Sequence, residues 1–131
     1  MTKFHHTSLS VKSIPESQAF YENVFGFKKV SEGKRPEMKA TFVNLEGEDG
    51  VRIELFEHDN PQVLKEDLMD FAKNGYKHLA FSVDNLEETI AKALRHGATI
   101  IWDIKLGITV KRIAFIADPN GLPIELLELN D

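Results

Sequence analysis

Four side chains suited to chemistry occur in this chain as two similar pairs, His6 with Glu54 and His78 with Glu125. Each glutamate stands inside an apolar run, RIELFE in one case and PIELLE in the other. Burying a carboxylate is unfavourable unless a partner stabilises its charge. Two imidazole nitrogens and two carboxylates are ligands that suit a divalent transition metal such as Zn²⁺, Ni²⁺, Co²⁺, Mn²⁺ or Fe²⁺. The sequence therefore predicts a metal site with water in its open positions.

The two pairs belong to a unit that is used twice. The segment from His6 reads H-T-S-L-S-V and the segment from His78 reads H-L-A-F-S-V, with an offset of 78 − 6 = 72. The two glutamates differ by 125 − 54 = 71, which is nearly the same offset. Such self-similarity indicates an internal duplication. We predict module one at about 4–57, a linker at about 58–75 and module two at about 76–128.

Each module is predicted to contain a strand, a helix and three further strands. The first strands, FHHTSLSV and KHLAFSV, alternate between two faces with period two. Ser13 and Asn85 each stand three residues before a glutamate, which is the spacing of a capping box, and Gly26 and Gly97 follow the helices. The later strands are predicted in FKKVSE, KATFVNLE and VRIELFE, and in ATIIWDI, KRIAFIAD and LPIELLEL.

The linker, DNPQVLKEDLMDFAKNG, is predicted to form a third helix. Asn60 would cap it and Pro61 would occupy its first turn. One face of this helix would carry Leu64, Leu68 and Phe71. The chain would then consist of two modules joined by a helical segment.

Period two also predicts which way the site residues point. The apolar face of each first strand suits packing under a helix, so His6 and His78 would lie on the opposite, concave face. Glu54 and Glu125 likewise alternate with the apolar residues of the last strands. His5 would point away from His6, into packing or solvent. Each module would thus offer one imidazole and one carboxylate from its concave side.

Structural roles compete with these assignments. A single histidine in a strand is more often structural than a ligand, and a glutamate in a strand more often lies on a solvated face or edge, as we expect for Glu57 and Glu128. What favours a site is that both the imidazole and the carboxylate recur at matching positions.

Composition narrows the function further. The chain has 131 residues, a formal net charge of −5 and no cysteine. An acidic chain without a basic run argues against nucleic acid as the main partner. The absence of cysteine excludes disulfides, thiolate metal sites and a cysteine nucleophile. No signal-peptide pattern or membrane-length apolar run occurs, so a cytoplasmic protein is expected.

Several motifs in combination resemble the vicinal oxygen chelate superfamily, which includes glyoxalase I, extradiol dioxygenases and fosfomycin-resistance proteins. They are HHTSLSV, SQAFYENVFGFK, RIELFE, GYKHLAFSVDNLEETIAKALRHGA and RIAFIADPNGLPIELLE, and they cover nearly the whole chain. The resemblance implies an α+β fold, in which tandem βαβββ modules form a cupped, barrel-like mixed sheet with helices outside. It also implies a single domain over residues 1–131.

The ligand set separates subgroups of this superfamily. Bacterial glyoxalase I binds its metal through His, Glu, His and Glu, and those positions match His6, Glu54, His78 and Glu125. Dioxygenases and fosfomycin-resistance proteins use two histidines and one glutamate, and methylmalonyl-CoA epimerase has glutamine in place of Glu54. The resemblance therefore implies a glyoxalase I-like subgroup (lactoylglutathione lyase type) that binds Ni²⁺ or Zn²⁺, with Co²⁺, Mn²⁺ or Fe²⁺ as alternatives.

The resemblance also implies a mechanism. A small oxygen-chelating substrate would isomerise through a metal-stabilised enediolate, with Glu125 as the base and Glu54 as ligand or second proton carrier. Lys105 belongs to a stretch that resembles a mobile substrate loop. His58 falls near a thiol-binding position, and Arg112 is a candidate for holding an anionic substrate. Ser10 replaces an arginine that holds glutathione in glyoxalase I, which leaves the thiol open.

Two other functions remain compatible with the sequence. One is a metal-dependent dioxygenase or another enzyme of the superfamily, and the other is a non-catalytic protein of the resistance type that sequesters a ligand. Relatives often bring modules of two chains together, so a homodimer is expected, although the modules could also pair within one chain.

Overall fold

Two sheets carry the candidate site residues, one in each of two compact units of the chain. The computed structural model describes all 131 residues. Unit 1 comprises Met1–Val63 and unit 2 comprises Leu64–Asp131.

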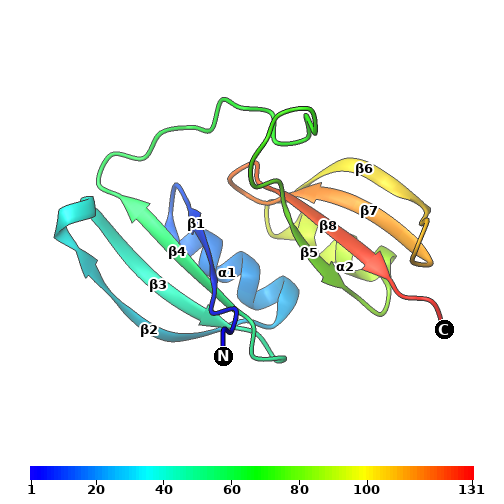
Figure 1. The fold of residues 1–131 in the computed structure, drawn as a ribbon, viewed down its shortest axis with the longest axis horizontal. Coiled ribbons are helices and arrows are strands. Elements are labelled where there is room, and N and C mark those ends of the chain that lie inside the picture. Colours follow the sequence, from blue (N-terminus) through cyan, green and yellow to red (C-terminus); the bar gives the residue numbers. More distant parts are fainter. The chain divides into compact units, whose positions relative to one another are not determined.

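Unit 1 contains one helix and a four-stranded mixed sheet (Figure 1). Its strands are ordered β1-β4-β3-β2, with β1 parallel to β4 and the other neighbours antiparallel. Helix α1 packs against β3 and β4. The elements are β1 (Thr7–Ser10), α1 (Ile14–Phe25), β2 (Lys28–Arg35), the short 3₁₀ helix η1 (Pro36–Met38), β3 (Ala40–Glu46) and β4 (Arg52–His58).

Unit 2 repeats this topology. Its strands are ordered β5-β8-β7-β6, β5 is parallel to β8, and α2 packs against β6, β7 and β8. The elements are β5 (Leu79–Ser82), α2 (Leu86–Arg95), β6 (Thr99–Leu106), β7 (Arg112–Ala117) and β8 (Pro123–Glu128). The predicted α+β fold with tandem βαβββ modules is therefore confirmed.

The parallel strand pairs place the two copies of the site in equivalent registers. Ser8 lies opposite Glu54 across β1 and β4, and Ala80 lies opposite Glu125 across β5 and β8. The residues that flank each glutamate are almost completely buried, and they are Ile53, Leu55, Ile124 and Leu126. Apolar burial of these neighbours fixes which face of the sheet each glutamate occupies, since a shift by one residue would turn them outwards.

Both helices begin at the predicted caps. The Ser13 hydroxyl accepts the backbone N–H of Glu16 at 3.3 Å, and the Asn85 side chain accepts that of Glu88 at 2.9 Å. Such caps stabilise a helix by about 1 kcal/mol each. Gly26 ends α1 in the left-handed region with φ 75°, which favours glycine. Neither helix has the length and apolar character needed to cross a bilayer.

The helix predicted for the linker at about 58–75 does not form, so this part of the prediction is wrong. The segment between β4 and β5 contains only turns and irregular backbone. Asp67 and Asp70 accept the backbone N–H groups of Met69 and Ala72, and such local bonds compete with helical ones. Phe71 is 51% exposed, so the expected apolar face lacks the burial that stabilises a short helix.

Candidate metal centre

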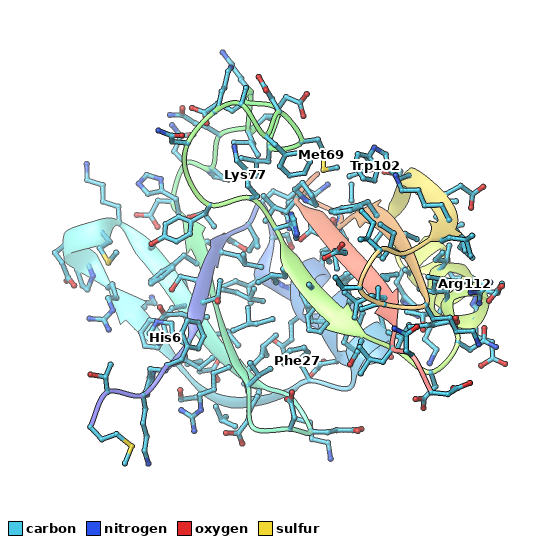
Figure 2. All side chains as sticks on the ribbon, turned by 45° about the vertical axis from the view of Figure 1, so that its right-hand side comes forward. His6, Phe27, Met69, Lys77, Trp102 and Arg112 are labelled. Carbon is cyan, nitrogen blue, oxygen red and sulfur yellow. The ribbon has the colours of Figure 1, made fainter.

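His6 and Glu54 form the candidate pair of unit 1. His6 directly precedes β1 (Figure 2), and Glu54 lies in β4. The His6 Nε2 atom is 3.3 Å from Glu54 Oε1. Glu54 is buried, with 7% of its surface exposed, while the His6 side chain is 36% exposed. The sheet thus holds the carboxylate in place, and the imidazole reaches it from the more open side.

Polar groups surround this pair. The Ser8 hydroxyl donates to Glu54 Oε1 at 2.9 Å. Asn44, which lies opposite Glu54 on β3, donates from its amide to the Ser31 hydroxyl at 2.9 Å. From the sequence alone, no role at the site is predicted for Ser8. The signal that could have found it is its position two residues after His6, which places it opposite Glu54 in the strand pairing.

His5 contacts His6, contrary to the prediction that it points away. Their Nδ1 atoms are 2.8 Å apart and their rings meet edge to face. The physical reason is that β1 begins only at Thr7, so the alternation of a strand does not govern these two residues. A hydrogen bond on Nδ1 of His6 leaves Nε2, which faces Glu54, as its second ring nitrogen.

His78 and Glu125 form the candidate pair of unit 2. His78 directly precedes β5, and Glu125 lies in β8. The His78 Nε2 atom is 3.7 Å from Glu125 Oε1, and the two side chains are 23% and 22% exposed. This pair is therefore wider than that of unit 1, and its carboxylate is more open. Ala80 supplies no hydroxyl at the position where Ser8 stands in unit 1.

Aromatic rings surround the pair of unit 2. His78 meets the ring of Phe115 edge to face at 5.0 Å and that of Phe71 at 6.2 Å. Trp102 meets the same two phenylalanines at 4.8 and 6.5 Å. Phe115 lies opposite Glu125 on β7 and is almost completely buried. Phe71 and Phe115 thus hold the imidazole by packing, and Trp102 packs against both of them; from the sequence alone, no role at the site is predicted for any of these three rings.

The N···O separation in unit 1 matches that of two ligands of one ion, whereas the separation in unit 2 is wider than that of a ligand pair or of a hydrogen bond. A charge-assisted N–H···O bond is about 2.7 to 2.9 Å long. Two donors that are each about 2.1 Å from one ion, at angles near 90 to 110°, lie about 3.0 to 3.4 Å apart. The 3.3 Å separation in unit 1 falls in this range, and the 3.7 Å separation in unit 2 lies slightly above it.

The donors are brought together only as pairs. No group of three or more His, Asp or Glu side chains that could hold a metal ion is present. Each unit provides one nitrogen and one oxygen, which is half of the predicted set of four ligands. One donor of each pair is an imidazole nitrogen and the other is a carboxylate oxygen, and this combination suits a borderline divalent ion such as Zn²⁺ or Ni²⁺.

The three predicted substrate residues lie in different surroundings. Lys105 lies in β6, with its ammonium 4.0 Å from the centre of the Trp102 ring, so it is adjacent to the aromatic cluster of His78. His58 is exposed at the end of β4, where its Nδ1 accepts the backbone N–H of Asn60. Arg112, which Figure 2 labels, begins β7 and forms ion pairs with Glu87 and Glu128 of its own unit.

Arg112 links β8 and α2 by ion pairs with one carboxylate from each. Its guanidinium donates to Glu128 from Nε and Nη2, each at 2.7 Å, and to Glu87 at 2.7 and 2.9 Å. These bonds, together with the N–H of Leu86, hold the pKa of Glu128 at about 2, and the Arg112 bonds also lower the pKa of Glu87. Arg112 could bind a substrate only by giving up these bonds.

Glu57 and Glu128 lie in strands, and each accepts a backbone N–H group at the N-terminus of one helix. Glu57 accepts the backbone N–H of Ile14 at 2.6 Å, and Glu128 accepts that of Leu86 at 2.9 Å. Glu128 is 7% exposed, so the expectation that it lies on a solvated face or edge is wrong. The helix N-terminus explains this placement, because its free N–H groups and dipole stabilise a carboxylate.

A family model described as the glyoxalase/bleomycin resistance protein/dioxygenase superfamily matches residues 3–126 of the chain. Lactoylglutathione lyase of Salmonella typhimurium is 38% identical, and the match covers 96% of this chain and 92% of that protein. An uncharacterized Escherichia coli K12 protein, YaeR, is 33% identical over 98% of this chain and 97% of its own.

A solved structure agrees with these sequence matches. The trypanothione-dependent glyoxalase I of Leishmania major superposes with a TM-score of 0.77 at 28% identity. The superposition covers 98% of this chain and 87% of that chain. The likeness therefore extends over both modules.

Proposed function

Because the chain belongs to the glyoxalase/bleomycin resistance protein/dioxygenase superfamily, we propose that it is a metal-dependent lyase of the glyoxalase I type. It would isomerise a small substrate that chelates the metal through adjacent oxygens. The observation that carries the proposal is the repeated His–Glu pair, with N···O separations of 3.3 and 3.7 Å at equivalent positions of both modules. The similarity to lactoylglutathione lyases over most of the chain supports the same reaction class.

His6, Glu54, His78 and Glu125 would hold one divalent ion, Ni²⁺ or Zn²⁺ in our proposal. The donor types support this ion, because each pair joins an imidazole nitrogen and a carboxylate oxygen, and the 3.3 Å separation in unit 1 is that of neighbouring ligands. When bound, such an ion supplies a Lewis acid that polarises a carbonyl group of the substrate.

Glu125 would move the proton. Its carboxylate would take the proton from the hydroxyl-bearing carbon beside the polarised carbonyl and return it to the former carbonyl carbon, while the hydroxyl proton passes to the former carbonyl oxygen. This transfer leaves the numbers of atoms and electrons unchanged, so it requires no oxidant or reductant. Support comes from the openness of Glu125, which is 22% exposed on its side chain, whereas that of Glu54 is only 10% exposed.

The substrate we propose is the hemithioacetal of a 2-oxoaldehyde, such as methylglyoxal, with a thiol. Lactoylglutathione lyase relatives support the reaction class, and the Leishmania relative uses trypanothione, so the thiol differs among proteins of this fold. Ser10, which is exposed in β1, has no positive charge with which to bind the carboxylates of a thiol such as glutathione. Lys105, whose ammonium lies 4.0 Å from the centre of the Trp102 ring, is a cation adjacent to the aromatic cluster that surrounds His78.

The test combines metal binding with turnover. We expect purified protein to bind about one divalent ion per His–Glu–His–Glu set and to isomerise methylglyoxal hemithioacetals of at least one of several thiols. Glu125→Gln should lower kcat by about 10²- to 10⁴-fold, because glutamine cannot accept the proton. His78→Ala should lose the ion, while His96→Ala, which removes an imidazole from the end of α2, should keep it.

Two results would contradict the proposal. One is full metal content in His78→Ala, which would remove that residue from the ligand set. The other is a metal-loaded protein that turns over no hemithioacetal but retains a ligand or consumes oxygen with a catechol. The expected homodimer stays a prediction, which analytical ultracentrifugation would check.

A further inference from the structure

The two candidate carboxylates stand at equivalent strand positions but have different neighbours. Across β1 and β4 the residue opposite Glu54 is Ser8, and across β5 and β8 the residue opposite Glu125 is Ala80. The duplication therefore supplies an internal comparison in which the backbone is the same and one hydroxyl is present or absent.

The hydroxyl fixes the orientation of Glu54. Ser8 Oγ donates to Glu54 Oε1 at 2.9 Å, and the same oxygen lies 3.3 Å from His6 Nε2. Ser8 and His6 thus both contact Oε1, the oxygen whose separation from His6 suits a shared ion, and the Ser8 hydrogen bond restricts where this oxygen lies. Glu125 has a single such neighbour, His78 at 3.7 Å, so its carboxylate is less constrained.

We propose that Ser8 is a positioning residue that keeps Glu54 as the fixed metal ligand and so leaves Glu125 as the carboxylate that moves. The inference rests on the proposed metal-dependent function. Hydrogen bonds to a ligating carboxylate orient it toward the ion, and losing such a partner typically lowers metal affinity about 10- to 100-fold. The absence of the hydroxyl at Ala80 gives Glu125 the freedom that proton transfer between two carbons needs.

The experiment moves the hydroxyl from one module to the other. Metal affinity is measured by chelator competition with Ni²⁺ and Zn²⁺, and kcat and KM are measured with the best thiol. Ser8→Ala should weaken metal binding at least 10-fold, and Ser8→Thr, which keeps a hydroxyl, should restore it. Ala80→Ser should lower kcat several-fold with KM nearly unchanged, while metal affinity stays the same or rises.

The matched control is Ser10→Ala, which removes a hydroxyl from the same strand face and should leave metal affinity unchanged. Thermal unfolding of the metal-free variants tests for a merely structural effect, which at an exposed serine should stay within about 0.5 kcal/mol. Wild-type affinity in Ser8→Ala, with wild-type kcat in Ala80→Ser, would overturn the role of Ser8 alone. A wild-type protein that binds neither ion would overturn the proposed function as well.

Discussion

The two modules hold equivalent His–Glu pairs by different means. In unit 1 the pair is surrounded by hydrogen-bonding groups, with Ser8 on Glu54 and His5 on His6. In unit 2 the imidazole of His78 meets the faces and edges of Phe71 and Phe115, and no hydroxyl reaches Glu125. The backbone topology and register are the same in both units.

This difference suggests that the two modules of the duplicated fold have different roles in the proposed site. Hydrogen bonds restrict both the position and the orientation of a carboxylate, whereas aromatic packing positions a ring and leaves a neighbouring carboxylate free to turn. In our proposal, the hydrogen-bonded pair of unit 1 would hold the ion. The aromatic surroundings in unit 2 would hold an apolar part of the substrate beside Glu125 as the base, with the partly exposed Trp102 nearby.

The largest expected loss of stability comes from a substitution that disrupts the aromatic packing of unit 2. Phe115 is 3% exposed and meets both His78 and Trp102, so Phe115→Ala leaves a cavity in unit 2. Phenylalanine to alanine changes of this kind cost about 3 to 5 kcal/mol. We expect a loss of this size in urea denaturation, together with weaker metal binding, because His78 loses the ring that positions it.

The matched change in unit 1 is Asn44→Ala. Asn44 occupies the same register position beside Glu54, but its side chain bonds only to Ser31 near the surface. We expect a change within about 0.5 kcal/mol. If both variants lost similar stability, the distinction between a packed and a hydrogen-bonded half would fail.

A second difference lies at the carboxylates that cap the helices. Glu128 pairs with Arg112, whereas Thr41 stands opposite Glu57 at the equivalent position of unit 1. Arg112 and the N–H of Leu86 lower the pKa of Glu128 from 4.5 to about 2. The unfolded chain therefore takes up this proton first, and the stabilisation is complete above pH 4.5 and is lost as the pH falls toward 2.

Glu128→Gln should destabilise the protein at pH 7 and remove part of its stability loss between pH 4.5 and 2. Glutamine can still accept the N–H of Leu86, so the change isolates the pairing with Arg112. Glu57→Gln is the control, because it makes the same change at a helix cap where threonine replaces the arginine partner. Urea denaturation at several pH values measures both, and identical acid profiles for wild type and Glu128→Gln would contradict the assignment.

The module architecture could be predicted from the sequence because several local signals agreed. The cap residues Ser13 and Asn85, the alternation around Glu54 and Glu125 and the offset of 71 to 72 residues all indicated the same repeated unit. Such agreement between levels is what specifies a fold. The site pairs followed from the same alternation, since each glutamate falls between two buried residues.

What failed depended on contacts that local patterns do not encode. The linker helix was predicted from apolar spacing, but Asp67 and Asp70 use their side chains for turns and Phe71 remains exposed. The direction of His5 was inferred from strand alternation two residues before β1 begins. Burial of Glu128 depends on the distant N–H of Leu86 and on Arg112, neither of which its own strand reveals.

The smallest expected effect concerns a feature that the modules share. Ser13→Ala and Asn85→Ala each remove one N-terminal cap, and each should cost about 1 kcal/mol in urea denaturation. The exchange Ser13→Asn with Asn85→Ser is the control, and it should keep wild-type stability because both side chains accept the same N–H. Similar costs at both caps would locate the asymmetry of the molecule around the His–Glu pairs. A clearly larger cost at one cap would instead show that the two scaffolds differ as well, and the contrast between the pairs would then need to be corrected for it.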